Sequence, residues 1–261
     1  MARPLRVKGH VRLAKRARRD DWHADVRPSL RGLDGAERER LAQVWLADAL
    51  EEHASVASFA RLALQLVSLG APPELLRATQ RATLDEIAHA ELCFGLASAY
   101  AGRELGPGPL RTDDALEGEL AASDIAVAAV REGCVAETIG AMIATAAATR
   151  AEDPVVRAIL RRIAADETRH AGLAWRYLRW AVTRDRMLAR VVSDAFDAEV
   201  SRFTANFSST RELEDDTWWA RHGRLTARKR TLVASRTLRE VILPCRDALL
   251  AETRSHLAAG A

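Results

Sequence analysis

The sequence is poor in cysteine and aromatic residues, and it contains no long hydrophobic run. Three of its 261 residues are cysteines, Cys93, Cys134 and Cys245, and no two of them form a CxxC pair. This small, odd set excludes a disulfide framework, a zinc knuckle and a rubredoxin-type iron site. Since no stretch of about 18 uncharged apolar residues occurs, the sequence predicts no membrane-spanning helix.

Several functional motifs are missing as well. The chain has no glycine-rich phosphate-binding loop, no nucleophile elbow and no Ser-His-Asp spacing. The N-terminus is basic but lacks the apolar segment of a secretory signal. We therefore expect a soluble cytoplasmic protein.

The abundant residues favour helices. Apolar residues make up 48% of the chain, and alanine, leucine and arginine dominate, whereas strand-forming runs of valine, isoleucine and threonine are scarce. This composition predicts an all-α protein. A length of 261 residues suits one large domain, or a core domain with an added subdomain.

Positive charge is concentrated at the N-terminus. Residues 1–19 contain eight lysines or arginines and no acid, so that, of a net charge of +3, the remaining chain contributes −5. We expect a basic, largely irregular arm over residues 1–35, with its arginines in solvent. Contact of this arm with nucleic acid or another acidic surface stays open as the alternative.

The rest of the chain follows a helical pattern. We expect four long helices, at 36–69, 73–101, 114–150 (with a break near Ser123) and 154–183. Gly70 and Gly102 mark helix ends. Pro73 and Pro154 mark helix starts, because proline is tolerated in the first turn of a helix.

These helices divide the chain into three parts. Residues 1–35 form the arm, residues 36–183 a four-helix bundle, and residues 184–261 a C-terminal helical extension packed on it. The glycine- and proline-rich segment 102–110 links the two helix pairs and is expected to cross the bundle. Within the extension we expect two or three helices, with a kink at Pro244.

One short motif occurs twice, 81 residues apart. It reads DEIAH at 85–89 and DETRH at 166–170. In each copy the glutamate and the histidine are three residues apart, so both leave the same face of a helix. Pro73 and Pro154 each lie 13 residues before the glutamate of the motif, so two helical hairpins of one design follow each other.

The repeated glutamates and histidines are predicted to point into the bundle. Their helix faces also carry small and apolar residues: Ala82, Ala90, Cys93, Ile163, Ala171 and Ala174. An ionised glutamate on a buried face is costly unless it is paired or binds a metal. Two metal ions resolve this cost, and carboxylate with imidazole suits iron or manganese. The sequence therefore predicts Glu86, His89, Glu167 and His170 as metal ligands.

Each Glu-x-x-His helix needs a neighbouring helix that supplies one further glutamate. In the first helix, two adjacent residues, Glu51 and Glu52, are candidates. The helical neighbours of Glu52 form an apolar stripe, whereas those of Glu51 form a polar one. Glu52 is therefore the predicted ligand.

The third helix also offers two candidates, Glu132 and Glu137. Glu132 lies 35 residues before Glu167, close to the 34 that separate Glu52 from Glu86, so we prefer Glu132 as the ligand. Positions five apart on a regular α-helix point about 140° apart, and a π-bulge would turn both toward one face. We expect this bulge near the glycine at position 133, with Glu137 lining or joining the site as a catalytic residue.

Asp85 and Asp166 each precede a predicted glutamate ligand. A carboxylate at this place is expected to accept the far ring N–H of a ligand histidine. An exposed helix acid without a role at the site is the alternative.

The ordered ligands resemble those of the ferritin-like di-iron superfamily. They are Glu52, Glu86-x-x-His89, Glu132 and Glu167-x-x-His170. The DEIAH and DETRH forms are similar to the monooxygenase branch, and the resemblance covers about residues 40–182. It implies an antiparallel ferritin-like four-helix bundle, here with additional C-terminal helices, and a site for two iron ions. Manganese or a mixed manganese–iron pair stays open.

The resemblance also implies an activity, namely an O₂-activating di-iron oxygenase or oxidase. Its substrate would be small, carrier-borne or RNA, and a tRNA substrate is considered because of the basic arm. A ferroxidase or rubrerythrin-like peroxidase and a non-redox helical binding protein are the alternatives. Because no rubredoxin module is present, we expect electrons from a separate ferredoxin or reductase. A homodimer is left open.

Overall fold

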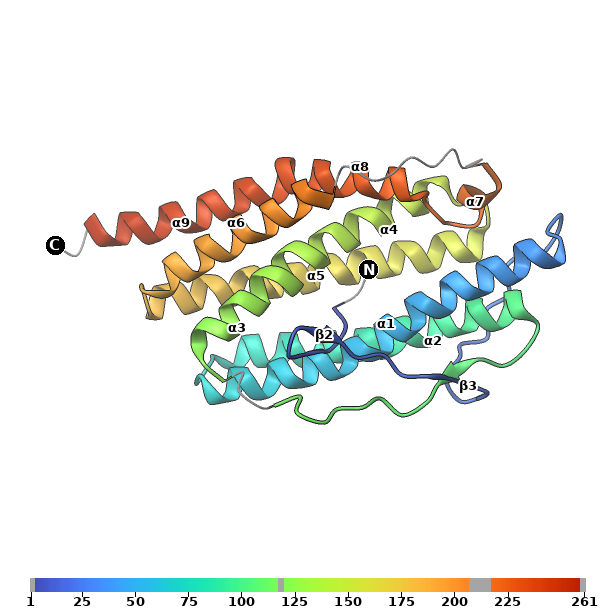
Figure 1. The fold of residues 1–261 in the computed structure, drawn as a ribbon, viewed down its shortest axis with the longest axis horizontal. Coiled ribbons are helices and arrows are strands. Elements are labelled where there is room, and N and C mark those ends of the chain that lie inside the picture. Colours follow the sequence, from blue (N-terminus) through green and yellow to red (C-terminus); the bar gives the residue numbers. More distant parts are fainter. Residues whose placement is uncertain (1–2, 117–119, 207–216, 259–261) are drawn as a thin grey trace.

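A computed structural model describes residues 3–116, 120–206 and 217–258 of the protein. Within these residues the chain is mostly helical, as predicted, with four two-residue strands (Figure 1). In chain order the elements are β1 (Arg6–Val7), β2 (His10–Val11), β3 (Arg16–Ala17), α1 (Gly35–Ser68), α2 (Pro73–Ala101), β4 (Gly106–Pro107), α3 (Ala122–Ala128), the π-helix η1 (Ala129–Glu137), α4 (Thr138–Arg150), α5 (Pro154–Arg184), α6 (Leu188–Asn206), α7 (Thr217–Arg221), α8 (Ala227–Thr237), the π-helix η2 (Leu238–Ile242) and α9 (Leu243–Ala258).

Local signals set the helix ends. α1 begins with a capping box, in which the side chains of Asp34 and Glu37 each accept the other residue's backbone N–H. α2 and α5 begin at prolines, and the Asp153 carboxylate accepts two N–H groups from the first turn of α5. Three predicted helices agree with the structure within one residue. The third was predicted to start at 114 and starts at Ala122.

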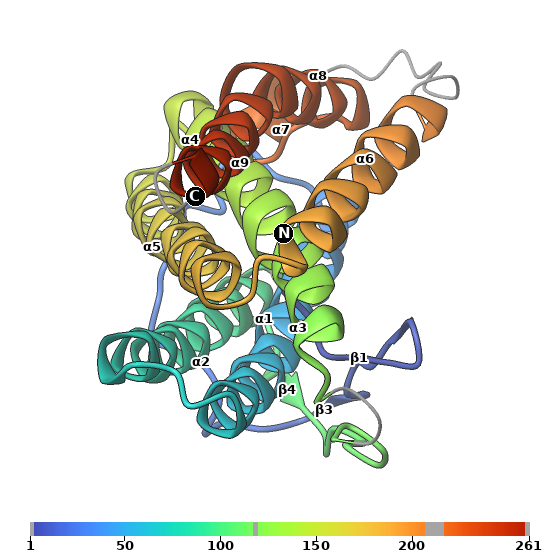
Figure 2. The ribbon, with the colours of Figure 1, turned by 90° about the vertical axis from the view of Figure 1, so that its left-hand side faces the viewer.

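Four long segments surround one hydrophobic core: α1, α2, the continuous run α3–η1–α4, and α5 (Figures 1 and 2). α1 packs antiparallel along α2, α4 packs antiparallel along α5, and α2 also contacts α5. The described part of the link between the two hairpins, 102–116, runs back along the first hairpin (Figure 1). Both hairpins therefore place the middle of their helices at the same level of the core.

The N-terminal arm is part of the folded structure. Its strands β1 and β2 form a hairpin, and β3 pairs with β4. The buried Leu5 donates its backbone N–H to the Ala54 carbonyl of α1 at 3.2 Å, and Ala24 donates to the Glu91 carbonyl of α2 at 3.0 Å. The expectation that the arginines of this arm lie in solvent is wrong for Arg3, which is only 4% exposed.

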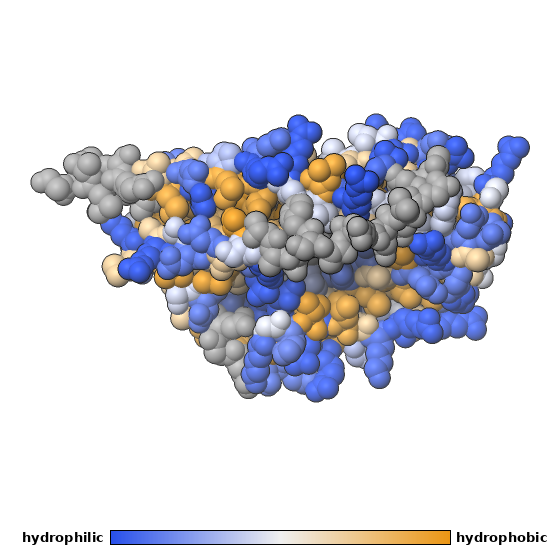
Figure 3. Space-filling view, turned by 45° about the horizontal axis from the view of Figure 1, so that its top comes forward, coloured by the Kyte–Doolittle hydropathy of each residue, from blue (hydrophilic) through white to orange (hydrophobic). Residues whose placement is uncertain are grey.

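The C-terminal helices cover the second hairpin. α6 contacts α3 and η1, α8 contacts α4, and α9 contacts α5. In place of a simple kink at Pro244, the chain forms η2 just before it, because proline cannot donate to the preceding turn. On this face, hydrophobic residues gather in patches between hydrophilic ones (Figure 3). None of the helices among the described residues has the apolar length needed to cross a bilayer.

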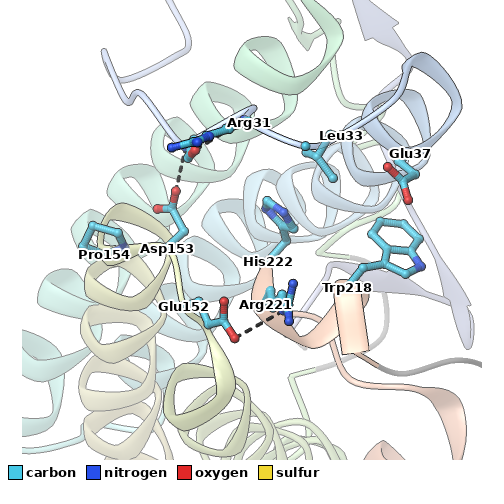
Figure 4. A pocket seen from close by; sticks show the side chains of 11 residues that line it. Arg31, Leu33, Glu37, Glu152, Asp153, Pro154, Trp218, Arg221 and His222 are labelled. Atoms are coloured by element: carbon cyan, nitrogen blue, oxygen red, sulfur yellow. Dashed lines mark hydrogen bonds and ion pairs between the residues drawn. The ribbon is translucent and has the colours of Figure 1, made fainter.

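The arm, the second hairpin and the C-terminal helices meet at one end of the molecule, around a cavity of about 340 Å³ (Figure 4). The Ser29 backbone N–H donates to the Asp153 carboxylate at 2.6 Å. Glu152, in the turn before α5, pairs with Arg221 of α7 at 3.3 Å. The three parts are thus joined by polar contacts between residues far apart in the sequence.

Gly133 lies in η1 where this segment packs closest to α5. A Cβ placed on Gly133 would lie 2.3 Å from the Cβ of Ala174. Real carbon atoms do not approach that closely, so no larger residue fits without moving one of the two helices. The glycine therefore sets the distance between η1 and α5.

Replacing Gly133 by alanine is expected to destabilise the protein, although alanine favours a helix by about 1 kcal/mol over glycine. Overpacking of this kind typically costs about 1–3 kcal/mol, which leaves a net loss of up to about 2 kcal/mol, so we expect the Tm to fall by up to roughly 8 °C in thermal unfolding followed by circular dichroism. The matched change Gly35→Ala, where nothing lies within 4 Å of the added Cβ, should stay within about 0.5 kcal/mol. A Tm of Gly133→Ala at or above that of the unchanged protein would contradict the close packing.

Candidate metal centre

Four glutamates and two histidines meet between the four long segments. Each is at most 3% exposed. They are Glu52 of α1, Glu86 and His89 of α2, Glu137 at the end of η1, and Glu167 and His170 of α5. Every long segment therefore contributes at least one acidic side chain to the same buried place.

The six residues form two overlapping groups, in each of which the possible ligand atoms lie within 4.8 Å of one another. The first group is Glu52, Glu86, His89 and Glu167, and the second is Glu86, Glu137, Glu167 and His170. Glu86 and Glu167 belong to both groups. The cluster thus offers two adjacent places for an ion. Each is surrounded by three carboxylates and one imidazole, and both share Glu86 and Glu167.

The histidines point one ring nitrogen into the cluster and the other toward an aspartate. Nδ1 of His89 lies 3.8 Å from Oε2 of Glu86, whereas its Nε2 lies 3.0 Å from Oδ2 of Asp166. Nδ1 of His170 lies 3.1 Å from Oε1 of Glu86, and its Nε2 lies 3.3 Å from Oδ2 of Asp85. Each DExxH helix therefore supplies the aspartate that contacts the histidine of the other helix.

This crossed arrangement fixes the orientation of both imidazoles. An ionised carboxylate only accepts hydrogen bonds, so Nε2 of His89 and of His170 must be the donor. When the imidazole is neutral, its Nδ1 then keeps a lone pair directed at the cluster. Nη2 of Arg169 lies 3.1 Å from Asp85 and also pairs with Asp166, which holds the two carboxylates in place.

Burial and mutual repulsion disfavour ionisation of most of the glutamates. Burial, followed by the charge of Glu86, raises the pKa of Glu52 well above its ordinary value. Burial and the neighbouring Glu137 likewise raise the pKa of Glu167, and burial raises the pKa of Glu137 to about 8. Without a cation, several of these carboxyl groups would hold a proton at neutral pH.

The pKa values of Glu86, His89 and His170 shift in the directions expected for ion pairs. Burial alone would raise the pKa of Glu86, but the nearby imidazoles of His170 and His89 outweigh this effect and lower the pKa. Burial alone would lower the pKa of the histidines. The hydrogen bond to Asp166 and the negative charge of the nearby Glu86 raise the pKa of His89. The hydrogen bond to Asp85 and the nearby Glu86 raise the pKa of His170 to about 9. Cations that bind here would displace these protons.

Many polar atoms of the cluster have no hydrogen-bond partner. They are Oε2 of Glu52, both carboxylate oxygens of Glu86, Glu137 and Glu167, and Nδ1 of His89 and His170. Buried polar atoms are rarely left unpaired, because desolvation without a new bond costs free energy. Two divalent cations would bond these atoms and balance the four carboxylate charges. The residues present therefore fit a two-metal site.

Glu132 belongs to neither group, and the preference for Glu132 over Glu137 is corrected accordingly. Its Oε2 lies 3.3 Å from Nε of Arg3 and 3.9 Å from Nη2 of Arg61. The three side chains are buried, at 7%, 4% and 5% exposed respectively. A carboxylate held by two buried arginines is neutralised by them and needs no metal ion.

The preference for Glu132 assumed that the two hairpins have the same length between their two ligand positions. Glu52 lies 34 residues before Glu86, but Glu137 lies only 30 before Glu167. Glu52 is 16 residues from the end of α1 and Glu137 is 13 from the end of α4, and the turn after α4 is one residue shorter. The segment from the ligand glutamate to the end of the connecting turn is thus four residues, or about one helical turn, shorter in the second hairpin than in the first. The predicted π-helical segment exists as η1, and it ends on Glu137.

Sequence reasoning missed both arginine partners of Glu132. Arg61 continues the polar stripe of α1, in which Ser55 and Ser58 are fully buried, so a buried polar face of this helix could have been inferred from the sequence. Nothing local pointed to Arg3, which is 129 residues from its partner.

Comparisons with known proteins add no assignment. No family model, no curated protein and no solved structure matches the chain. Any statement on function therefore rests on the geometry of the buried cluster.

The two glutamates of η1 can be separated by experiment. Glu137→Gln keeps the size of the side chain but removes its charge, so binding of at least one divalent ion should weaken tenfold or more, in line with the roughly 10–100-fold losses typical of metal-site changes. Glu132→Gln should still bind two ions per chain, although its Tm should fall, because two buried arginines lose their partner. Manganese titration of the folded proteins checks this. Loss of an ion only in Glu132→Gln would reverse the assignment.

The aspartate contacts predict a second effect. Asp166→Asn weakens the acceptor that orients His89, so metal affinity should fall about 10–100-fold without a large change in fold. Asp194→Asn is the matched control, because that carboxylate is exposed on α6, 3.8 Å from Arg190. Competition with a chelator measures both affinities. Equal affinity in the two variants would show that the aspartate does not act on the metal centre.

Proposed function

We propose that the protein is a ferritin-like di-iron carboxylate protein, whose four-helix bundle consists of α1, α2, α3–η1–α4 and α5. One observation carries the proposal: two groups of potential ligands share Glu86 and Glu167. Each group is completed by a terminal glutamate, Glu52 or Glu137, and by one histidine. A glutamate from each of two helices, with a Glu-x-x-His pair from each of the other two, is how such bundles hold two metals.

Two iron ions suit the donor set best, with manganese or a mixed pair as the alternative. Oxygen and imidazole ligands without thiolate are the donors that these metals accept. Four ionised glutamates carry four negative charges, which two divalent cations balance. Glu52, Glu86, His89 and Glu167 would hold one ion, and Glu86, Glu137, Glu167 and His170 the other.

We infer that the reaction is oxidation of an organic molecule by O₂. Two reduced iron ions, when bound, supply electrons for O₂ reduction, chemistry that amino-acid side chains lack. The chain's own part is to keep the imidazoles oriented through Asp85 and Asp166 and to exclude bulk water. Small buried residues at the ligand helices, such as Ala82, Ala90 and Ala129, favour a small or carrier-borne substrate.

The proposal includes a separate electron donor, a ferredoxin or a reductase. Among the described residues, Cys93 and Cys134 are buried, Cys245 is exposed, and none forms a disulfide. An RNA substrate is not favoured, because basic side chains of the arm form ion pairs with acidic residues of the same chain. Arg3 pairs with Glu132, and Lys8 lies 3.0 Å from Asp114. A homodimer stays a prediction.

Anaerobic titration with Fe(II) tests the proposal. We expect two irons per chain, and O₂ uptake with a change of the optical spectrum when air is admitted. Glu86→Ala combined with Glu167→Ala should abolish binding of both ions, since each group loses two ligands. The matched double variant Glu74→Ala with Glu91→Ala removes two exposed carboxylates from α2 and should bind two irons.

Each other result decides between the alternatives. Failure of the unchanged protein to bind iron or manganese would leave a non-redox helical protein. Two irons that do not react with O₂ or peroxide would remove the redox function. Rapid, repeated iron oxidation without any organic substrate would identify a ferroxidase, and rapid turnover with peroxide a rubrerythrin-like peroxidase.

A further inference from the structure

A cavity of about 240 Å³ opens beside the metal centre, between the β1–β2 hairpin, α1 and the start of the third long segment. Its lining is rich in arginine: Arg6, Gly9, Arg61, Asp124, Val127, Ala128, Arg131 and Glu132. Gly9, with φ +80°, and Lys8, with φ +50°, form the tight turn of the hairpin, which places Arg6 and Gly9 at the rim. Neither the proposed metal ligands nor their aspartate partners line this cavity.

Positive charge exceeds negative charge around the cavity. The lining contains three arginines and two acids. Arg3 pairs with Glu132 of the lining, Glu199 pairs with Arg131, and Arg202 pairs with Glu199. Five arginines therefore face three carboxylates. Glu132 is already held by Arg3 and lies near Arg61, and Glu199 is held by Arg202.

Arg6 and Arg131 are the least compensated members of this group. The guanidinium of Arg6 donates one long hydrogen bond, 3.5 Å, to the Gly9 carbonyl. Nε of Arg131 is buried without a hydrogen-bond partner, at 3.7 Å from the nearest oxygen of Glu199. Burial, followed by the charge of Arg131, lowers the pKa of Arg6. Two like charges placed together at a cavity indicate an anionic ligand, because an anion would relieve their repulsion.

The cavity lies close to the buried cluster. Its wall residue Glu132 contacts Arg3, and the guanidinium of Arg3 lies 5.1 Å from the ring centre of Phe59. The Phe59 ring in turn meets the ring of His170 at 5.1 Å between centroids. Two side chains in succession, Arg3 and Phe59, therefore connect Glu132 in the cavity wall with a proposed metal ligand, His170.

We propose that this cavity binds the carboxylate or phosphate group of a small organic anion through Arg6 and Arg131. A volume of about 240 Å³ is below the roughly 300–1,000 Å³ of pockets that enclose a whole drug-sized ligand, so the cavity accommodates a head group. The exposed Gly9 and Val127 at its edge leave it open to solvent. Resting on the proposed function, the bound anion is the substrate class of the metal centre, held by its charged end.

Calorimetric titration with two probes tests the binding. Octanoate and octyl phosphate share one tail and differ in the anionic group, so they distinguish a carboxylate site from a phosphate site. At least one probe should bind the full-length protein with a Kd below about 1 mM, and Arg131→Gln should weaken it tenfold or more, equivalent to about 1.4 kcal/mol. Arg6 lies in β1, whereas Arg131 lies in η1, and Arg6→Gln should weaken probe binding by a similar factor. Arg190→Gln, an arginine 90% exposed on α6, is the matched control.

Circular dichroism first establishes that each variant is folded. Binding of neither probe, or equal binding by Arg131→Gln, Arg6→Gln and the control, would overturn the anion site. Iron stoichiometry measured on the same proteins separates this result from the proposed function. Two irons per chain with lost probe binding in the two variants supports both. Probe binding by a protein that takes up no iron would keep the anion site and overturn its role in holding a substrate.

Discussion

The structure depends on how four buried carboxylates are kept together. Glu52, Glu86, Glu137 and Glu167 lie in one group of side chains at most 3% exposed, and burial raises the pKa of three of them. Such an assembly repels itself unless protons or cations intervene. The surrounding features all serve this constraint: paired hairpins bring the acids to one level, and Asp85 and Asp166 on opposite helices fix the histidines. The fold therefore holds four carboxyl groups close together in its core, where protons or bound cations must limit the repulsion between them.

Those features of the fold and the cluster that depend on neighbouring residues in the sequence could be predicted. Proline and capping signals gave the starts of α2 and α5, because these depend on residues within one turn. The two DExxH copies gave four of the six clustered side chains, since a spacing of three fixes a shared helix face whatever the helix packs against. Glu52 followed from the same reasoning, because an apolar stripe on α1 identifies the side facing the core.

The parts that depend on distances between helices could not be predicted in the same way. Choosing Glu137 over Glu132 requires the length of the second hairpin beyond the site and the course of η1, neither of which is fixed by a short sequence pattern. Both glutamates are buried, so burial alone does not distinguish them. They differ in their partners. Glu132 lies near arginines from the arm and from α1, whereas both carboxylate oxygens of Glu137 lack a hydrogen-bond partner and lie within the cluster.

This difference places the N-terminal arm beside the buried cluster. Nε of Arg3 lies 3.3 Å from Oε2 of Glu132, so this carboxylate has a charged partner, whereas Glu137, five residues further on, lies in the buried cluster. Burial raises the pKa of Glu137, and the charge of Arg3 opposes that rise. Arg3 also lies against Phe59, which touches His170. The basic composition of residues 1–19 is thus explained in part from within the molecule: a core that concentrates negative charge is bordered by arginines that the rest of the chain positions. The arm, which the sequence offered as a candidate for contact with nucleic acid, thus lies between the proposed metal centre and the cavity proposed to bind an anion.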